Sequence, residues 1–155
     1  MKKSIFIIAM AVAATACNNA SQQQTAEHDA EVQTTATSGT DLFDKEWKLT
    51  ALNGEAITVD TTFKRDPLLV FGKENNQVSG NGGCNGFGSS FELSGDDGIV
   101  ISDITATQMA CPNLDLEQRF FEVLKAVKSY RIEGHTLTLA DENGGATAQF
   151  ELVTK

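Results

Sequence analysis

Short segments in which apolar and polar residues alternate fill most of the chain after residue 42, and they constrain its fold more than any other feature. Residues 47–51 alternate strictly, and residues 137–139 do so near the end. A period of two places every second side chain on the same face of a strand. Turn-forming pairs such as Asn143-Gly144 separate the segments and favour hairpins. The pattern therefore predicts about seven or eight short strands, mostly antiparallel.

One segment has the period of a helix instead. Its apolar residues recur every three or four positions, at Leu116, Phe120, Val123, Leu124 and Val127. Pro112 lies just before this segment, and Asn113 or Asp115 is the expected N-terminal cap. The apolar stripe of such a helix packs against the sheet. We therefore predict an α+β fold in which a mostly antiparallel, barrel-like sheet is crossed by one α-helix.

The start of the chain has the pattern of a secretory leader. Lys2 and Lys3 precede an apolar run over residues 5–14, which is shorter than the roughly 20 apolar residues of a membrane span. Cys17 follows Ala14-Thr15-Ala16, and this order resembles the bacterial lipobox, although that motif usually has Leu or another larger apolar residue at the position of Ala14. We expect a lipoprotein signal peptide over residues 1–16 and lipidation of Cys17. The alternative is an ordinary secretory leader, cut near Ala16, with an incidental cysteine.

Residues 17–41 are expected to hold the lipidated cysteine and a disordered tether. Residues 18–41 contain no aromatic residue, no lysine and no arginine, so they cannot bury enough apolar surface to offset the entropy of ordering. The folded domain then spans residues 42–155, an ordinary length for one domain. By resemblance to lipoprotein sorting in Gram-negative bacteria, Asn18 favours the outer membrane, with the domain facing the periplasm of the cell envelope.

The charge balance and the absence of several motifs narrow the classes of partner. The chain has 21 acidic residues against 12 basic ones, a formal net charge of −9, which argues against nucleic acid as a partner. It has no phosphate-binding loop, no paired histidines and no Cys-x-x-Cys unit, so we expect no metal and no cofactor. We expect a monomer whose partners include the membrane, through the lipid at Cys17.

Two motifs surround the cysteines of the predicted domain: Gly82, Gly83, Cys84 and Asn85, and then Thr107, Met109, Ala110 and Cys111. Together with the opening segment 47–49, Glu117 and Phe121, they resemble the META/HslJ domain family, with the departure that Gln108 stands where the family often has arginine. The resemblance implies a compact β-rich domain, barrel-like and crossed by a helix, in envelope proteins linked with heat shock, antibiotic tolerance or virulence. It implies no established enzymatic mechanism.

The two domain cysteines allow two interpretations. Beyond the inner membrane the compartment is oxidising, so a disulfide between Cys84 and Cys111 is the expected state. The alternative is a reactive Cys84, flanked by a glycine-rich segment. A nucleophilic cysteine needs a nearby base, and His135, the only histidine of the domain, falls in a predicted hairpin turn. We therefore expect no enzymatic activity.

The functional expectation is a cell-envelope lipoprotein with a binding or accessory role in envelope stress tolerance. Its unidentified partner is either a protein or an apolar ligand held between sheet and helix. Two alternatives remain at this level: a small β-barrel inhibitor of a hydrolase such as lysozyme, and a thiol-based enzyme that uses Cys84.

Overall fold

A computed structural model describes residues 41–154. The expectations for the leader over residues 1–16, for Cys17 and for most of the tether concern residues outside this range. Within it, no helix is both long enough and apolar enough to cross a membrane.

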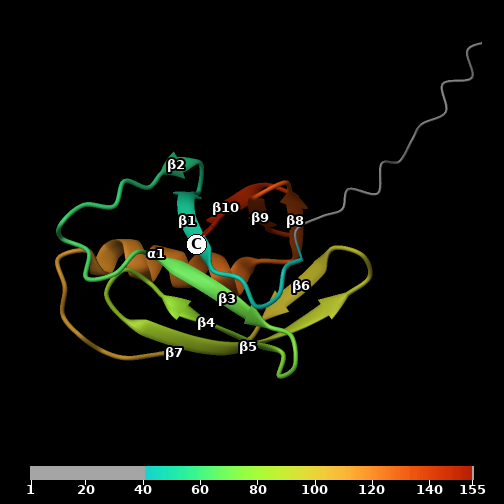
Figure 1. Cartoon of the computed structure of the whole chain (residues 1–155), viewed down its shortest axis with the longest axis horizontal. Helices are drawn as coiled ribbons and strands as arrows, with labels where there is room; N and C mark the ends of the chain where they lie inside the picture. The colour runs from blue at the N-terminus through green and yellow to red at the C-terminus, as the bar shows by residue number, and fades with distance from the viewer. Residues whose placement is uncertain (1–40, 155) are drawn as a thin grey trace, which may run out of the picture. The chain divides into compact units, whose positions relative to one another are not determined.

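The described residues form ten strands and one helix (Figure 1). The elements in chain order are β1 (Trp47–Leu52), β2 (Glu55–Ala56), β3 (Leu68–Gly72), β4 (Gln77–Asn81), β5 (Gly86–Ser94), β6 (Gly98–Ile101), β7 (Thr105–Ala106), α1 (Leu114–Ala126), β8 (Ser129–Glu133), β9 (Thr136–Ala140) and β10 (Ala146–Leu152).

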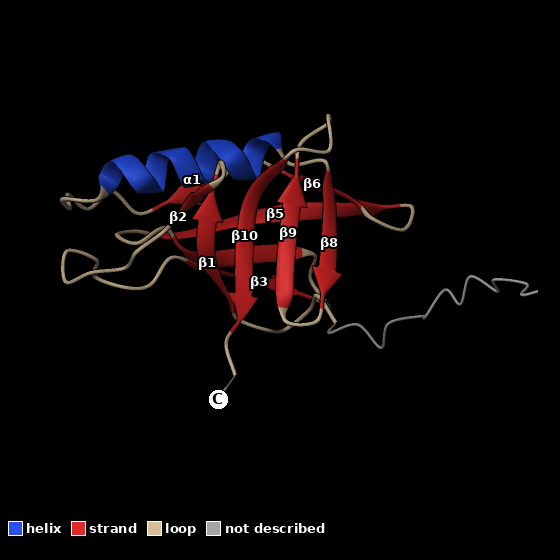
Figure 2. Cartoon of the chain, turned by 90° about the horizontal axis from the view of Figure 1, so that it is seen from above, coloured by secondary structure: helices blue, strands red, loops and turns tan. Residues whose placement is uncertain are grey.

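All pairs between these strands are antiparallel, and the sheet closes into a ring. Neighbours follow the order β10-β9-β8-β6-β5-β4-β3-β1, and β1 also pairs with β10. In that closing pair Trp47 lies opposite Leu152 and Leu49 opposite Phe150. Figure 2 shows α1 lying across the ends of β1, β10 and β9. The predicted α+β fold, with a barrel-like antiparallel sheet and one helix, is confirmed.

Alternation in the sequence places the core inside this ring. Trp47, Leu49 and Leu52 of β1 are essentially inaccessible to solvent, and so is Phe71 of β3. All five apolar residues of the predicted helical stripe are also buried: Leu116, Phe120, Val123, Leu124 and Val127. The ring of Phe120 packs edge-on against Phe87 of β5, with centroids 5.9 Å apart. Trp47 and Phe120 are therefore both part of the core between the helix and the sheet.

The structure differs from the sequence prediction in the number of strands. The two extra strands, β2 and β7, are two residues long and too short to show a period. Of the two, β7 positions the site. It pairs with the start of β5, where Ala106 lies opposite Phe87, and the Thr107 amide then donates to the Gly86 carbonyl at 3.1 Å. The segment after β7 is thereby held against the corner between β4 and β5.

Candidate functional site

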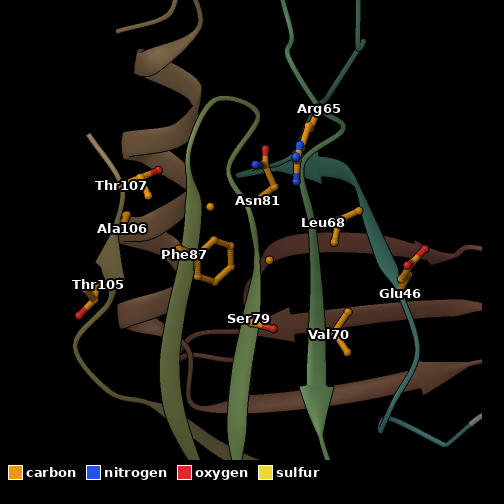
Figure 3. Close-up of a pocket in the computed structure, with 12 residues that line it drawn as sticks. Glu46, Arg65, Leu68, Val70, Ser79, Asn81, Phe87, Thr105, Ala106 and Thr107 are labelled. Atoms are coloured by element: carbon orange, nitrogen blue, oxygen red, sulfur yellow. The ribbon is translucent and has the colours of Figure 1, made fainter. Parts of the chain in front are cut away.

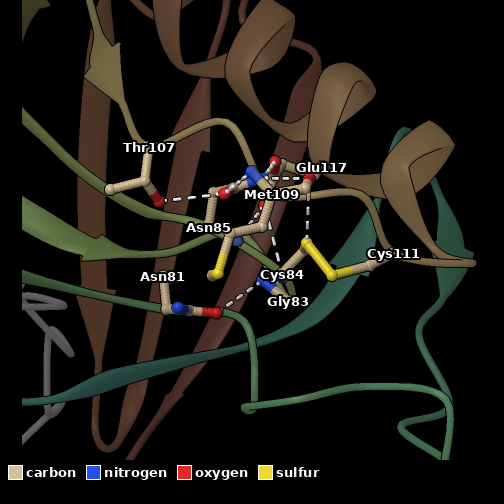
Figure 4. Close-up of a disulfide and its surroundings, with 8 residues drawn as sticks. All are labelled: Asn81, Gly83, Cys84, Asn85, Thr107, Met109, Cys111 and Glu117. Atoms are coloured by element: carbon tan, nitrogen blue, oxygen red, sulfur yellow. Dashed lines mark hydrogen bonds between the residues drawn. A yellow bond between two sulfur atoms is a disulfide. The ribbon is translucent and has the colours of Figure 1, made fainter.

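The two cysteine motifs meet at the corner between β4 and β5, residues 82–85, which we call the cysteine corner. A disulfide joins Cys84 to Cys111, with Cα atoms 6.0 Å apart (Figure 4). Cys84 is buried, and Cys111 lies three residues before the start of α1. The bond thus fastens the helix entry to the sheet. The expected disulfide is present in this structure.

The carboxylate of Glu117, in the first turn of α1, lies inside the cysteine corner with only 4% of the residue exposed. Its Oε2 accepts backbone hydrogen bonds from the amides of Asn85 at 2.6 Å and Cys84 at 3.2 Å. Its Oε1 accepts a bond from the Asn85 side-chain amide at 2.7 Å. Burying a carboxylate is costly unless its oxygens are hydrogen-bonded. Three donors meet that requirement here.

The side chain of Asn85 makes every hydrogen bond that an amide can make. Besides its bond to Glu117, Nδ2 donates to the Met109 carbonyl at 3.2 Å. Its Oδ1 accepts from the Met109 amide at 2.7 Å and from the Thr107 hydroxyl at 2.9 Å. Asn85 therefore links the helix to the segment after β7 (Figure 4).

Glycine is needed at each of the two positions of the motif for a different structural reason. A Cβ atom at Gly82 would lie 2.7 Å from Oε2 of Glu117, so only glycine leaves room for the carboxylate. Gly83 has a φ of +107°, a conformation that side chains disfavour. Its amide donates to Oδ1 of Asn81 at 2.8 Å. This geometry explains why the motif has glycine at both positions.

Four residues of the second motif segment are exposed although its backbone is held tightly. Thr107, Gln108, Met109 and Ala110 are all exposed, with Met109 44% exposed. Together with Phe121 and Leu114 they surround a shallow pocket of about 310 Å³, and Asn85 and Glu117 also line it. Gln108 therefore occupies a surface position, where the charge of an arginine would change the surface of the domain rather than its core.

A larger groove lies on the outer face of the ring, and we call it the outer groove (Figure 3). It has a volume of about 650 Å³ and is lined by Glu46, Arg65, Leu68, Val70, Ser79, Gly80, Asn81, Gly86, Phe87, Thr105, Ala106 and Thr107. These residues come mainly from β3, β4, β5 and β7. No motif in the sequence indicated this groove, because its residues are far apart along the chain and two of them are glycines.

A model of the META domain family matches residues 40–154. The chain belongs to the META domain family. No curated protein matches the chain. Two solved structures have a similar fold. One is an NMR structure of a protein from Burkholderia xenovorans, with 23% identity and a TM-score of 0.59, over 74% of this chain and 85% of the other. The second is also an NMR structure, with 28% identity and a TM-score of 0.56, over 72% of this chain and 91% of the other.

Within this META domain, the groups first considered for chemistry do not form a reactive cluster. Cys84 is bonded to Cys111, so its sulfur has no thiol proton. His135 is exposed in the turn between β8 and β9. Among residues 41–154, no three side chains of the metal-binding types gather closely enough to hold a metal ion.

Glu117 is the ionisable residue that is buried against the cysteine corner. In the sequence it was noted only as one of the residues that resemble the META family. An acidic residue between Leu116 and Phe120 suggests a solvated flank of a helix. Its true surroundings depend on Gly82 and Asn85, more than thirty positions earlier. One signal was present: two glycines beside a cysteine mark a place where another group approaches the backbone closely.

Proposed function

We propose that this protein is a cell-envelope lipoprotein, anchored through Cys17 in the outer membrane and facing the periplasm, whose META domain acts by binding. In this proposal the domain is not an enzyme and serves envelope stress tolerance or maintenance. The leader pattern before Cys17 supports the anchor. Family membership supports the envelope role, because the META/HslJ resemblance links such domains with heat shock and antibiotic tolerance.

The observation that carries the binding role is that the side chains of Cys84, Asn85 and Glu117 are all used internally at the cysteine corner. Cys84 is in a disulfide, the Asn85 side chain makes four hydrogen bonds, and the Glu117 carboxylate accepts three. A catalytic group needs an unused lone pair or proton within reach of a substrate. The corner therefore fits a structural role, and the concave surfaces beside it fit ligand recognition.

Metabolic labelling tests the anchor. Cells that express the wild-type chain are grown with radiolabelled palmitate, and the protein is followed by autoradiography and membrane fractionation. We expect label on the wild type and on Cys111→Ser, and none on Cys17→Ser, which should become soluble or stay uncleaved. The control changes a cysteine of the domain and leaves the leader intact. Equal labelling of Cys17→Ser, or unchanged fractionation, would refute the anchor.

Deletion of the gene tests the envelope role. The deletion strain is compared with its parent under heat and under antibiotics that act on the envelope. We expect reduced survival that the wild-type chain restores and Cys17→Ser restores poorly. Survival equal to that of the parent under all of these conditions contradicts a stress role. This test measures survival and not ligand binding, so its outcome is independent of the binding experiment described below.

A further inference from the structure

We propose that the outer groove binds the carboxyl end of an extended peptide whose last residues are apolar. This inference rests on the proposed binding role and names the class of partner. Its chemistry comes from three parts of the groove: an apolar floor, a cation that has no partner in residues 41–154, and a side-chain amide that can donate into the groove.

The apolar floor follows from the register of β3 and β4. Leu69 and Phe71 point into the core, so Leu68 and Val70 face outward and line the groove. In the neighbouring β4–β5 ladder Gly80 lies opposite Phe87 and Gly86 lies opposite Asn81, and the two glycines present no side chain. Phe87 also lines the groove, although it is only 6% exposed and its ring packs on α1. Such a floor suits aliphatic or aromatic side chains.

The cation is Arg65, which points into the groove from the loop before β3 (Figure 3). Its guanidinium makes no hydrogen bond or ion pair with any residue in the range 41–154, whereas Arg119 pairs with Glu55 and Lys48 with Asp66. An arginine fork matches the two oxygens of a carboxylate. In a chain with a net charge of −9, an arginine without a partner in residues 41–154 favours the binding of an anion at that point.

The loop that carries Arg65 is itself ordered. The amides of Lys64 and Arg65 both approach the Gly83 carbonyl, at 3.2 and 3.5 Å. Earlier in the loop, Asp60 accepts the Thr62 hydroxyl at 2.6 Å and the Thr62 amide at 2.8 Å. These bonds hold the pKa of Asp60 below its usual value. Arg65 is therefore presented from a loop anchored to the cysteine corner, which limits the entropy lost on binding.

The amide donor is Asn81, which is only 7% exposed and lines the same groove as Arg65. Its Oδ1 accepts the Gly83 amide, which fixes the amide plane. Its Nδ2 has no partner among the described residues and lines the groove. Because this nitrogen is not among the fully buried side-chain atoms that lack a partner, it reaches the groove, where it can donate a hydrogen bond to a ligand oxygen. Arg65 and Asn81 are the two side-chain donors of the groove that we assign to the peptide carboxylate.

The groove is open and partly polar, which favours a peptide over an acyl chain. The hydroxyl residues Ser79 and Thr105 line it, and these suit a backbone with its own donors and acceptors. Its volume of about 650 Å³ is in the range of ligand sites, roughly 300–1,000 Å³. Beyond Val70 and Glu46 it continues into a second hollow of about 400 Å³, which Leu152 and Val153 also line. The carboxylate of Glu46 there disfavours an anion, so the peptide carboxylate belongs at Arg65.

The test uses the full chain, purified from cell envelopes and reconstituted in lipid nanodiscs, with empty nanodiscs as the blank. The probes are fluorescein-labelled hexapeptides that differ only in their last two residues, from Val-Phe and Ala-Leu to Ser-Lys, each made with a free carboxylate and with a C-terminal amide. Fluorescence anisotropy measures the dissociation constant. We expect the apolar free acids to bind at least ten times more tightly than their amides and than the Ser-Lys peptide.

Two pairs of variants locate the binding. Arg65→Gln should weaken binding about tenfold, and Lys64→Gln, the same charge change on the adjacent residue outside the groove lining, should not. Gly86→Leu should abolish binding, because a Cβ there has room, with its nearest contact 3.8 Å away, and the longer side chain fills the groove. Gly88→Leu adds the same side chain on the same strand, at an open position outside the groove lining. Thermal unfolding of each variant checks that the fold is intact.

Several results overturn the proposal: no binding by any peptide, equal binding of acids and amides, or equal loss in Lys64→Gln and Arg65→Gln. Displacement of a bound apolar peptide by palmitate at lower concentration than by the unlabelled peptide assigns the groove to a lipid instead. None of these results affects the labelling and survival experiments, which test the anchor and the envelope role separately.

Discussion

The side chain of Glu117 occupies the space that a side chain at Gly82 would need. Its Oε2 lies 2.7 Å, and its Cγ 2.5 Å, from the position that a Cβ atom at Gly82 would have. The missing side chain on one strand corner thus permits a buried charge on the helix. This relationship makes the cysteine corner sensitive to changes that would be harmless elsewhere in the domain.

Gly82→Ala is therefore expected to destabilise the fold. A methyl group would displace the carboxylate and weaken its charge-assisted bonds, at a loss of about 2–3 kcal/mol in the free energy of unfolding. Denaturation in urea measures this loss. Gly88→Ala is the matched control, since nothing lies within 4 Å of its Cβ position. We expect no loss there. Equal stability of the two variants would show that Glu117 has freedom to move.

Glu117→Gln tests the charge itself. The glutamine has one acceptor oxygen and one donor nitrogen, so it cannot accept from both the backbone amides and the Asn85 side chain. We expect a loss of about 1.5–3 kcal/mol, measured by urea denaturation. Glu122→Gln, on the exposed face of the same helix, should change the stability by no more than about 0.5 kcal/mol. An equally small effect at position 117 would contradict the hydrogen-bond arrangement described.

Asn85→Asp should be more severe than either change. It removes both side-chain donors and puts a second carboxylate beside Oε1 of Glu117, now 2.7 Å from Nδ2. Because like charges repel strongly in a buried site, we expect a loss of at least about 3 kcal/mol. Calorimetric unfolding at neutral pH gives the measurement. Asn143→Asp, an exposed turn residue, provides the comparison, and stability of Asn85→Asp close to that of Asn143→Asp would rule out this geometry.

Loss of the disulfide is expected to destabilise the domain through the unfolded chain. Cys84 and Cys111 are 27 residues apart, and a cross-link of that length removes about 3–4 kcal/mol of unfolded-state entropy on the loop-closure model. The double variant Cys84→Ser/Cys111→Ser should unfold at correspondingly lower urea concentration. Alkylation of unreduced protein from cell envelopes should find no reactive thiol at either position. Two thiols that react quickly would revive the interpretation of Cys84 as a nucleophile.

The sequence predicted the parts of the fold that depend on nearby residues. Alternation in residues 47–51 gave the buried face of β1, and the spacing from Leu116 to Val127 gave the buried face of α1. Asn113 was one of two expected caps, and it does occupy the N-cap position of α1, but its side chain makes no capping hydrogen bond. Capping by a side chain depends on local rotation about its own bonds, which the residue type alone does not determine.

The site was less predictable because it depends on pairs distant in the chain. The pairing of Cys84 with Cys111 followed from the expected compartment and the count of cysteines. Asn85 was expected to form a turn or hydrogen bonds, yet nothing in its neighbourhood named Met109 or Glu117 as the partners. The outer groove depends on which faces of β3, β4 and β5 turn outward together, and that is known only once the strands are in register.

The pairing of β1 with β10 has a consequence for how this chain can be rebuilt. Because the amide of Val153 donates to the carbonyl of Glu46 at 2.9 Å, the polypeptide leaves the domain beside the place where it enters. A short linker joining these ends, with a new opening at the exposed turn between Gly95 and Asp96, would keep every strand beside its present neighbours. The domain is thus suited to circular permutation. A reporter protein fused after its last strand would lie close to the point at which the chain enters the domain.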